Sequence, residues 1–311
     1  MSLFGIVIPF FSNEAYLYEM LCSVKNQTST EWVCVVVDDS GRENEAESTV
    51  LSLANPKITY IKNETNLGLA KCWNTGLEYM IRTFGPTVVG VVHADDVLEP
   101  QFVEVSLGGH ADNPSAVAVH TAVTVVDEHN EKRFSFPDFV KFHVAPYKHS
   151  RSISTTGDTG LASVLRGNFV FCPTVSFKTN LISLPLFDSN WTMAVDLDLI
   201  SRLLLQGQTI VGVPDFVYRY RRHRNNLTSR LTDTTVRFVE EIRFYRKVVV
   251  VCESVGFVKS AVTASHMTMI RLHILYRLLQ KMVRFDLSSS LKLVKVFRTT
   301  RILVTDTADQ P

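Results

Sequence analysis

The sequence VVGVVHADD, residues 88–96, joins an apolar strand directly to a pair of carboxylates. The run from Val88 to Val92 is typical of a strand that is covered on both faces of a parallel sheet. Asp95 and Asp96 stand just beyond its end. Hard divalent cations prefer oxygen ligands and are held by one or two carboxylates together with substrate phosphates. This ending therefore favours a metal–diphosphate site, with a turn or a helix cap as the alternative.

Apolar runs of the same kind recur on both sides of this stretch and alternate with helix-like segments. We expect strands at 4–9, 32–37, 57–61, 88–92 and 117–126, and helices at 16–26, 44–53 and 69–83. Near-continuous Val/Ile strands interleaved with helices predict an α/β fold with a mostly parallel sheet flanked by helices. Such sheets bind ligands at the carboxyl ends of their strands, and the polar residues of this sequence gather there.

The second half of the chain has a more mixed pattern. A helix is expected at 195–206 and strands at 210–213 and 216–222, whereas the polar and aromatic stretch 134–156 is interpreted as a loop beside a binding site. Residues 231–305 are helix-like and basic, with 13 Lys and Arg against 5 Asp and Glu. We therefore expect a basic helical extension after residue 230.

The composition excludes several classes of protein. The 311 residues include 32 Lys and Arg against 31 Asp and Glu, so the charge balance predicts no general attraction to nucleic acid. The five cysteines are scattered without a CxxC pair, which favours reduced thiols in the cytoplasm. The first residues, MSLFGIVIPFF, lack the basic start of a signal peptide, and no apolar run is long enough to predict a transmembrane helix.

Two further polar segments belong to the first half of the expected sheet. Asp38 and Asp39 close the second strand, where a carboxylate can accept a hydrogen bond from a base or a ribose, and a simple turn is the alternative. Asn66 lies in a polar loop that opens the helix expected at 69–83. Lys71 falls in the first turn of that helix, where the helix dipole does not favour a cation. An anionic partner would explain this lysine, although an exposed lysine needs no partner.

Two more segments occur in the second half. Asp196 is placed near the start of the helix expected at 195–206, where a carboxylate is a candidate general base and a capping role is the alternative. The segment YRYRRHRNN, residues 218–226, brings four arginines and a histidine after the last strand. Because guanidinium groups bind anions with paired hydrogen bonds, the segment predicts an anion site, with a solvated basic loop as the alternative.

The order and spacing of these segments resemble the family 2 glycosyltransferases of GT-A fold, from Gly5 to about Ser229. The opening strand and the loop after it look like that family's nucleotide loop, and Asp39 matches its base-binding aspartate. The segment from Asn66 to Asn74 is similar to its Asn-x-Gly segment, with a lysine near the basic position. The resemblance thus implies donor contacts by six residues of the first half: Pro9, Phe10, Asn13, Asp39, Asn66 and Lys71.

Three later matches concern the metal, the diphosphate and the base. His93-Ala94-Asp95-Asp96 resembles the family's Asp-x-Asp motif with a histidine in first place, which implies Mn²⁺ or Mg²⁺ on Asp95, helped by Asp96. Arg221-Arg222-His223 resembles the Arg-x-His element, so Arg221 and His223 are expected near the donor diphosphate. Val195-Asp196 resembles the Glu-Asp pair that supplies the catalytic base, with a valine in place of the first acid, and Asp198 stays a second candidate.

The resemblance implies an inverting transferase that moves a sugar from a UDP- or dTDP-sugar to the hydroxyl of a glycan or lipid-linked acceptor. Cell-surface polysaccharide or glycolipid synthesis is the expected setting. It also implies a GT-A domain at 1–230, with a nucleotide-binding half at about 1–125 and an acceptor half at about 126–230, followed by the extension 231–311. In this scheme Asp196 takes the proton of the acceptor hydroxyl, while the metal and Arg221 and His223 neutralise the leaving diphosphate.

Three other functions would use parts of the same pattern. A Rossmann dehydrogenase needs GxGxxG after the first strand, where this chain has no glycine between Pro9 and Asn13. A nucleotidyltransferase also combines carboxylates with a nucleotide fold, but it would carry a glycine-rich basic loop after the first strand. A non-catalytic sugar-nucleotide or carbohydrate-binding domain would have no reason to combine Asp39, Asp95 and Asp196.

The segment 267–301 carries eight Lys and Arg against Asp286 alone. Its polar face is expected to consist of His273, Arg277, Gln280, Lys281 and Arg284, and its apolar face of Ile270, Ile274, Leu278 and Leu279. A basic amphipathic helix can lie on an anionic membrane, so peripheral contact with the inner face of a membrane is one expectation. Packing on the catalytic domain, or a homo-oligomer, is the alternative.

Overall fold

The structure is a computed structural model that describes residues 2–134, 152–223, 231–232, 234–283 and 285–300. Its contacts divide the chain into two units. The first comprises residues 1–155, 169–190 and 207–223, and the second comprises residues 156–168, 191–206 and 224–311. The domain boundary expected at residue 230 stays a prediction.

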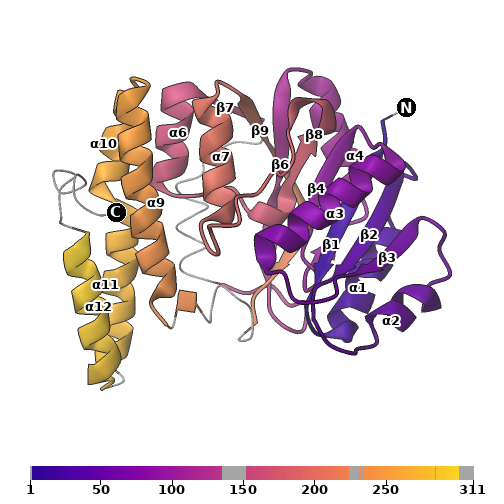
Figure 1. The fold of residues 1–311 in the computed structure, drawn as a ribbon, viewed down its shortest axis with the longest axis horizontal. Helices are drawn as coiled ribbons and strands as arrows, with labels where there is room; N and C mark the ends of the chain where they lie inside the picture. Colours follow the sequence, from indigo (N-terminus) through magenta and orange to yellow (C-terminus); the bar gives the residue numbers. More distant parts are fainter. Residues whose placement is uncertain (1, 135–151, 224–230, 233, 284, 301–311) are drawn as a thin grey trace. The chain divides into compact units, whose positions relative to one another are not determined.

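The described residues of the first unit build a sheet of nine strands in the order β3-β2-β1-β4-β8-β6-β9-β5, with β7 added beside β9 (Figure 1). The strands are β1 Phe4–Phe10, β2 Trp32–Asp38, β3 Ile58–Lys62, β4 Val88–Val91, β5 Val97–Leu98, β6 Ala116–Val126, β7 Ile153–Thr156, β8 Val175–Lys178 and β9 Thr209–Arg221. β1 pairs in parallel with β2 on one side and with β4 on the other. The carboxyl ends of these three strands therefore lie next to one another.

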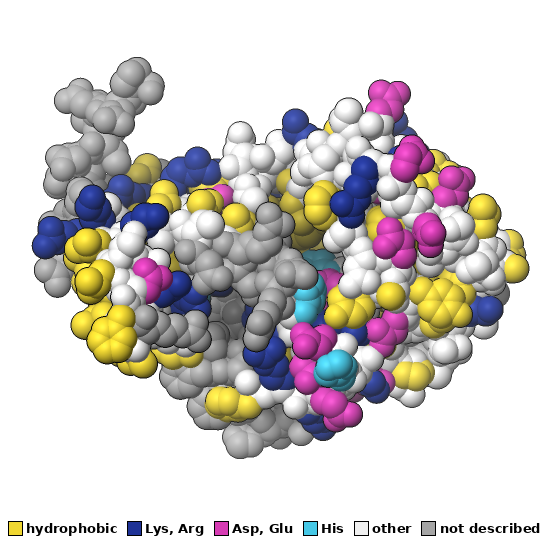
Figure 2. All heavy atoms as spheres, turned by 90° about the horizontal axis from the view of Figure 1, so that it is seen from below, with side chains coloured by type: hydrophobic (Ala, Val, Ile, Leu, Met, Phe, Trp, Pro, Cys, Tyr) yellow, Lys and Arg dark blue, Asp and Glu magenta, His cyan; other side chains and the backbone are white. Residues whose placement is uncertain are grey.

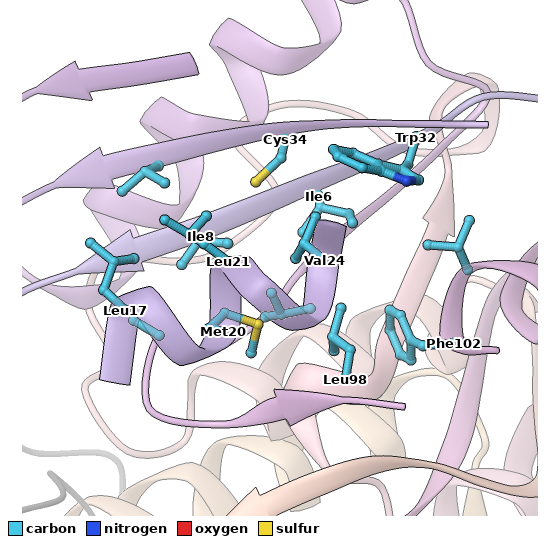
Figure 3. Packing of buried hydrophobic residues seen from close by; sticks show 14 of the residues in the cluster. Ile6, Ile8, Leu17, Met20, Leu21, Val24, Trp32, Cys34, Leu98 and Phe102 are labelled. Carbon is cyan, nitrogen blue, oxygen red and sulfur yellow. The ribbon is translucent and has the colours of Figure 1, made fainter. Parts of the chain in front are cut away.

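One face of β1 and β2 packs against the helix α1, Glu14–Lys25. Ile6 and Ile8 of β1 pair in register with Cys34 and Val36 of β2, and all four side chains are buried. Leu17, Met20, Leu21 and Val24 of α1 cover them (Figure 3). The helical spacing of these α1 residues places them on one face, which explains why this helix packs on the sheet. The helices α2, Ala46–Ser52, and α4, Phe102–Asp112, add residues to the same cluster.

The opposite face of β1 and β2 packs against α3, Leu69–Phe84. Gly76 brings this helix so close that an added Cβ would lie 2.4 Å from Cγ1 of Val7 and 2.8 Å from Cγ2 of Val37. The alternation of β-strand side chains thus explains the two layers of helices, because Ile6 and Ile8 point to α1 while Val7 points to α3. The expectation of a mostly parallel sheet flanked by helices is confirmed for this half of the sheet.

The described part of the second unit is helical. It contains α6 Gly157–Arg166, α7 Val195–Leu205, α9 Val236–Ser254, α10 Val258–His266, α11 Thr268–Val283 and α12 Leu287–Thr299. α10 packs on α6 and α9, α7 packs on α6 and α9, and α11 packs on α12 and α9. The expected helical character of the C-terminal extension is confirmed for these residues. None of the helices within the described residues is long and apolar enough to span a lipid bilayer.

Several local expectations were wrong or incomplete. Two short strands were expected at 210–213 and 216–222, but β9 runs unbroken from 209 to 221. Pro214 is accommodated because the pairing of β6 and β9 shifts register between His120 and Ala122, and a proline is tolerated where the ladder is interrupted. Within the stretch 134–156 expected to be a loop, residues 153–156 form β7, and residues 135–151 lie outside the described residues. The helices α4 and α6 were missed.

The close packing of α3 on the sheet predicts the effect of substituting Gly76. Gly76→Ala should lower the free energy of unfolding by about 1–3 kcal/mol, because the new methyl group overpacks the interface with Val7 and Val37. The matched control is Gly108→Ala in α4, where an added Cβ meets no atom within 4 Å. That change should stabilise the protein by about 0.5–1 kcal/mol. Urea denaturation of both variants checks this, and equal stability of the two would contradict the packing described.

Candidate donor and metal site

The loops after β1, β2 and β4 form one polar surface, because these strands are neighbours in parallel. Figure 2 looks toward this side of the sheet and shows histidine and acidic side chains gathered on it. At the end of β1, the carbonyl of Phe10 accepts a hydrogen bond of 2.8 Å from the backbone N–H of Asp39. The side chain of Phe10 is buried in the core, so only its backbone faces the loops. Pro9 is half-buried in the same strand.

Asn13 ends the loop after β1 and caps α1. Its backbone is left-handed, with a φ of 75°, and its side-chain oxygen accepts a hydrogen bond of 3.3 Å from the N–H of Tyr16. Asparagine tolerates this conformation better than most residues, and a capping oxygen satisfies an N–H that has no partner inside the helix. Asn13 is therefore a structural cap in this structure, and its predicted donor contact stays a prediction.

Asp38 and Asp39 both organise the backbone around them. Asp38 is fully buried and accepts hydrogen bonds from Ser40 N–H, Asn44 Nδ2 and the Tyr60 hydroxyl. Burial would raise the pKa of Asp38, but these hydrogen bonds outweigh it and lower the pKa below the ordinary value. The ionised carboxylate of Asp38 thus links the end of β2 to Tyr60 of β3 by a hydrogen bond.

Asp39 fixes the loop that opens α3. One carboxylate oxygen accepts from Asn63 Nδ2 and Leu67 N–H at 2.8 Å each, and the other accepts from Asn66 Nδ2 at 3.2 Å and Gly68 N–H at 3.0 Å. A carboxylate offers about four acceptor positions, so all of them are used within the chain. Asn66, predicted to contact the donor, is therefore one of the residues that hold the loop to Asp39. The part of Asp39 in base recognition stays a prediction.

Lys71 is exposed in the first turn of α3, as the sequence led us to expect. Its position follows directly from the loop that Asp39 fixes, because that loop sets where α3 begins. The structure therefore places a cation on the same side of the sheet as the other candidate residues.

His93, Asp95 and Asp96 offer ligand atoms that all lie within 4.8 Å of one another. Asp95 Oδ2 is 2.8 Å from His223 Nε2, which joins the loop after β4 to the end of β9. Burial would raise the pKa of Asp95, but the His223 hydrogen bond and the charges of His93 and His223 outweigh it and lower the pKa. Asp95 is thus charged at neutral pH, and its side chain is 32% exposed.

Asp96 has a different environment from its neighbour. It is buried, with one oxygen 2.8 Å from the Tyr218 hydroxyl and the other 2.7 Å from the N–H of Arg221. Burial and the negative charge of Asp95 raise the pKa of Asp96 well above its ordinary value. A bound cation would favour the charged form of both carboxylates. We conclude that Asp96 mainly braces the loop against β9, while Asp95 presents its carboxylate.

The two residues predicted near the diphosphate are placed differently. Arg221 is 2% exposed, and its guanidinium binds Glu19 Oε2 at 2.6 Å and Asn130 Oδ1 at 2.9 Å while it lies over the Tyr16 ring. It therefore cross-links β9 to α1 beneath the surface. His223 is less buried and touches Asp95 directly. The geometry favours His223 over Arg221 as a residue close to a ligand.

The two candidate bases lie in the second unit, at the start of α7. Asp198 is buried and bound to Arg202 Nε at 2.7 Å, with Lys247 Nζ at 3.6 Å. Asp196 is half-buried, and its Oδ2 accepts a hydrogen bond of 3.2 Å from Asn168 Nδ2. Asp198 is therefore engaged in ion pairs, whereas Asp196 is only half-buried.

Sequence analysis missed the residues that hold these groups in place, namely Glu19, Tyr218, Asn168 and Glu240. Glu19 is 202 positions from its partner Arg221, and Tyr218 is 122 positions from Asp96. No local pattern connects residues so far apart. The only signal in the sequence was the alternation of β9, which turns Tyr218 toward the covered side of the sheet.

The metal expectation can be tested against these donors. Two carboxylates suit Mg²⁺ and Mn²⁺, and an imidazole is tolerated better by Mn²⁺ and other transition metals than by Mg²⁺. His93, Asp95 and Asp96 converge closely enough to share one ion. The residues present therefore fit a divalent cation, and they fit Mn²⁺ at least as well as Mg²⁺.

Comparisons with known proteins concern the family and the fold of the chain. The family model described as Glycosyl transferase family 2 matches residues 5–166, more than half of the chain. The amylovoran biosynthesis glycosyltransferase AmsE of Erwinia amylovora is 23% identical over 273 residues, covering 87% of this chain and 94% of that one. An uncharacterized glycosyltransferase of Methanocaldococcus jannaschii is 22% identical over 224 residues, with 70% of each chain covered.

Solved structures show the same fold. TarS of S. aureus in complex with UDP-GlcNAc superposes with a TM-score of 0.60 at 16% identity, covering 96% of this chain and 92% of that one. The mannosyltransferase PcManGT of Pyrobaculum calidifontis, solved with GDP-Man and Mn²⁺, gives a TM-score of 0.55 at 14% identity over 96% and 86% of the two chains. The expected GT-A fold is confirmed by these neighbours.

The four hydrogen bonds to Asp39 predict the effect of Asp39→Asn. An amide keeps one acceptor oxygen but turns a donor toward N–H groups, so at least one buried donor loses its partner. The free energy of unfolding should fall by about 1–3 kcal/mol, as measured by urea denaturation. Asp215→Asn is the control, since its exposed carboxylate on β9 should change stability by less than about 1 kcal/mol. Wild-type stability in Asp39→Asn would contradict the bracing role.

Proposed function

Because the chain belongs to glycosyl transferase family 2 and is a glycosyltransferase, we propose that it binds a nucleoside-diphosphate sugar at the carboxyl ends of β1, β2 and β4. The observation that carries this proposal is the convergence of His93, Asp95 and Asp96 beside the loop that Asp39 holds. Transfer of the sugar to an acceptor hydroxyl, with inversion at the anomeric carbon, is the reaction we propose.

We propose a UDP- or dTDP-sugar as the donor. The complex of TarS with UDP-GlcNAc supports a uridine nucleotide, and that of PcManGT with GDP-Man shows that the fold accepts other bases in relatives. Loops after β1 and β2 would contact the base, and exposed Lys71 would lie toward a phosphate. AmsE is named for amylovoran biosynthesis, which supports a glycan acceptor in polysaccharide synthesis. We propose that this glycan is carried on a lipid. We place this activity in the cytoplasm.

His93, Asp95 and Asp96 would hold a divalent cation, Mn²⁺ or Mg²⁺, in this site. When bound, such an ion supplies positive charge that stabilises a departing diphosphate. Asp95 contributes the accessible, charged carboxylate, and His223 orients it through the bond to Oδ2. Asp96 and Tyr218 keep the loop in place through their hydrogen bond. In this proposal Arg221 does not contact the phosphates. It fixes β9 to α1 through its ion pair with Glu19.

Asp196 is the general base in this proposal. It would accept the proton of the acceptor hydroxyl as that oxygen attacks the sugar. Two observations support Asp196 over Asp198, namely the lower burial of Asp196 and the ion pairs that already occupy Asp198. Val195 in place of the family's first acid leaves Asp196 as the carboxylate that matches the pair.

Chelation tests the metal role. Release of nucleoside diphosphate should stop in EDTA and return with Mn²⁺, across a panel of UDP- and dTDP-sugars. Asp95→Asn should weaken donor binding in Mn²⁺ much more than in its absence, because the accessible ligand is lost. Asp215→Asn, an exposed carboxylate on β9, is the control and should behave as wild type. Full turnover in EDTA would refute the metal role.

The assignment of the base predicts a contrast between two neighbouring variants. Asp196→Asn should slow single-turnover transfer by about 10²–10⁴-fold with donor affinity unchanged, because only proton removal is lost. Asp198→Asn should keep the transfer rate but lose about 1–3 kcal/mol of stability, because Arg202 and Lys247 lose their partner. If Asp198→Asn transfers slowly and Asp196→Asn transfers at the wild-type rate, the general base is Asp198, two residues from the position assigned here.

We further propose contact of the C-terminal helices with an anionic membrane, through a face that matches the expected one only in part. Ile270 and Ile274 are 3% and 0% exposed, so the apolar surface assigned to them is used inside the helical unit. Lys281 is bound to Asp286 and does not extend a free basic face. The expected apolar face was wrong for these two residues, because α11 packs on α9 and α12, whereas Leu279, also expected on that face, is 63% exposed.

The exposed apolar residues form another surface, called here the apolar ridge. It consists of Leu272, Leu275, Leu279, Met282, Val283, Phe285, Leu287 and Leu291, which are 41–89% exposed. The first four have helical spacing on the outer side of α11, opposite Ile270 and Ile274, and the others continue through the turn into α12. Figure 2 shows hydrophobic and basic side chains together on the side of the molecule where Figure 1 places α11 and α12.

Charge favours lipid as the partner of the apolar ridge. Lys292, Lys295 and Arg298 are exposed on α12, which contains no acidic residue. Anionic headgroups would complement these three cations, whereas a second copy of the chain would present the same charges. Phe285 is 89% exposed at the turn, where a side chain can enter the boundary between headgroups and acyl chains.

Flotation with vesicles tests the membrane proposal. The full chain should float with phosphatidylglycerol vesicles and much less with phosphatidylcholine vesicles. Phe285→Glu should lower binding at least about tenfold, and replacing Lys292, Lys295 and Arg298 by Gln should lower it roughly 100-fold. Leu51→Glu, at a leucine of the first unit that is 69% exposed, is the control. No flotation of the wild type, or a dimer that Phe285→Glu dissociates, would refute lipid as the partner.

A further inference from the structure

Glu240 of α9 binds the backbone just before α7. Its Oε1 accepts hydrogen bonds from three successive N–H groups, those of Thr192 at 2.9 Å, Met193 at 2.6 Å and Ala194 at 2.8 Å. Ala194 is the N-cap of α7 and has no side chain that can cap the helix. The first N–H groups of a helix have no partner within it, and convergent backbone N–H groups bind anions. Glu240 thus binds the N–H of the N-cap residue and the two N–H groups before it, and so ties the turn that leads into α7 to α9.

Other residues of α9 hold the same segment. Arg243 and Lys247 lie over the ring of Trp191 at 4.5 and 5.2 Å, and Phe244 meets that ring edge-on at 5.8 Å. Lys247 also approaches Asp198. One side of α9 therefore contacts segment 191–198 at three places: the ring of Trp191, the backbone of residues 192–194 and the buried carboxylate of Asp198. This helix lies outside residues 5–166, where the family model matches.

Asp196 lies two residues after Ala194, the last residue whose backbone N–H binds Glu240. The position of its carboxylate depends on the backbone of residues 192–195 and on the hydrogen bond from Asn168. Without Glu240, three N–H groups would lose the carboxylate that binds them, and the turn that leads into α7 would no longer be tied to α9 at this point. A displacement of about 1 Å at a catalytic group can cost about 100-fold in rate.

We propose that Glu240 is a positioning residue for Asp196, so that the C-terminal helix α9 is part of the catalytic machinery. This inference rests on the proposed role of Asp196 as the base. Glu240 touches neither substrate nor reacting atoms in this scheme. It acts only through the backbone that carries Asp196, and its effect on the rate disappears when Asp196 is absent.

Kinetics of Glu240 variants test the proposal. Glu240→Ala should lower kcat by roughly 10–100-fold and leave the donor Kd unchanged. Glu240→Gln keeps an acceptor oxygen in the same place and should restore most of the loss. Glu241→Ala removes the next carboxylate of α9, which is paired with Arg237, and should keep the wild-type kcat. Circular dichroism at the assay temperature confirms that each variant is folded.

A double variant separates positioning from mere stabilisation. In the Asp196→Asn background, Glu240→Ala should slow transfer by less than about twofold more, because both changes act at one group. Losses that multiply, or a normal kcat in Glu240→Ala with only a lower Tm, would overturn the positioning role. Wild-type transfer by Asp196→Asn would instead refute the base assignment, and the two failures are thereby distinguished.

Discussion

The parallel pairing of β1 with both β2 and β4 is the constraint on which the donor site depends. It brings three strand ends together, and each end then carries polar residues that could not be buried within the sheet. The pairing is stabilised by apolar side chains on both faces, with α1 on one side and α3 on the other. The close packing of α3 at Gly76 limits the positions that the loop before α3 can take. Asp39 then holds this loop through the N–H groups of Leu67 and Gly68.

Burial divides the carboxylates of this chain into two groups. Asp38, Asp39, Asp96 and Asp198 are buried, and each is bound by at least two donors or cations of the chain. Asp95 and Asp196 are partly exposed, and among the described residues each receives a side-chain hydrogen bond from one partner, His223 or Asn168. A buried carboxylate must be satisfied within the protein, whereas an exposed one can bind a ligand. Of these six, the two partly exposed carboxylates are the ones proposed to bind a ligand or accept a proton, and Asp96 would add its carboxylate to the metal site from a buried position.

The central strands and the helices between them were predictable because burial on both faces leaves continuous apolar runs and helical spacing leaves a clear stripe. α4 was missed because its glycine pair Gly108 and Gly109 weakens the helical pattern. The candidate residues were found from their types at strand ends, but their partners were not. Arg221 could be placed in an anion site by type alone, and only the fold shows that Glu19 already neutralises it. The exposed face of α11 likewise depends on packing with α9 and α12.

A crystal grown with Mn²⁺ and a nucleoside diphosphate tests the central claim most directly, because the anomalous signal of manganese locates the ion without reference to activity. The account predicts one peak bound by Asp95, within the group formed with His93 and Asp96, and in contact with the diphosphate. A nucleotide bound with no manganese at this group, or a manganese peak held by other residues, would contradict it.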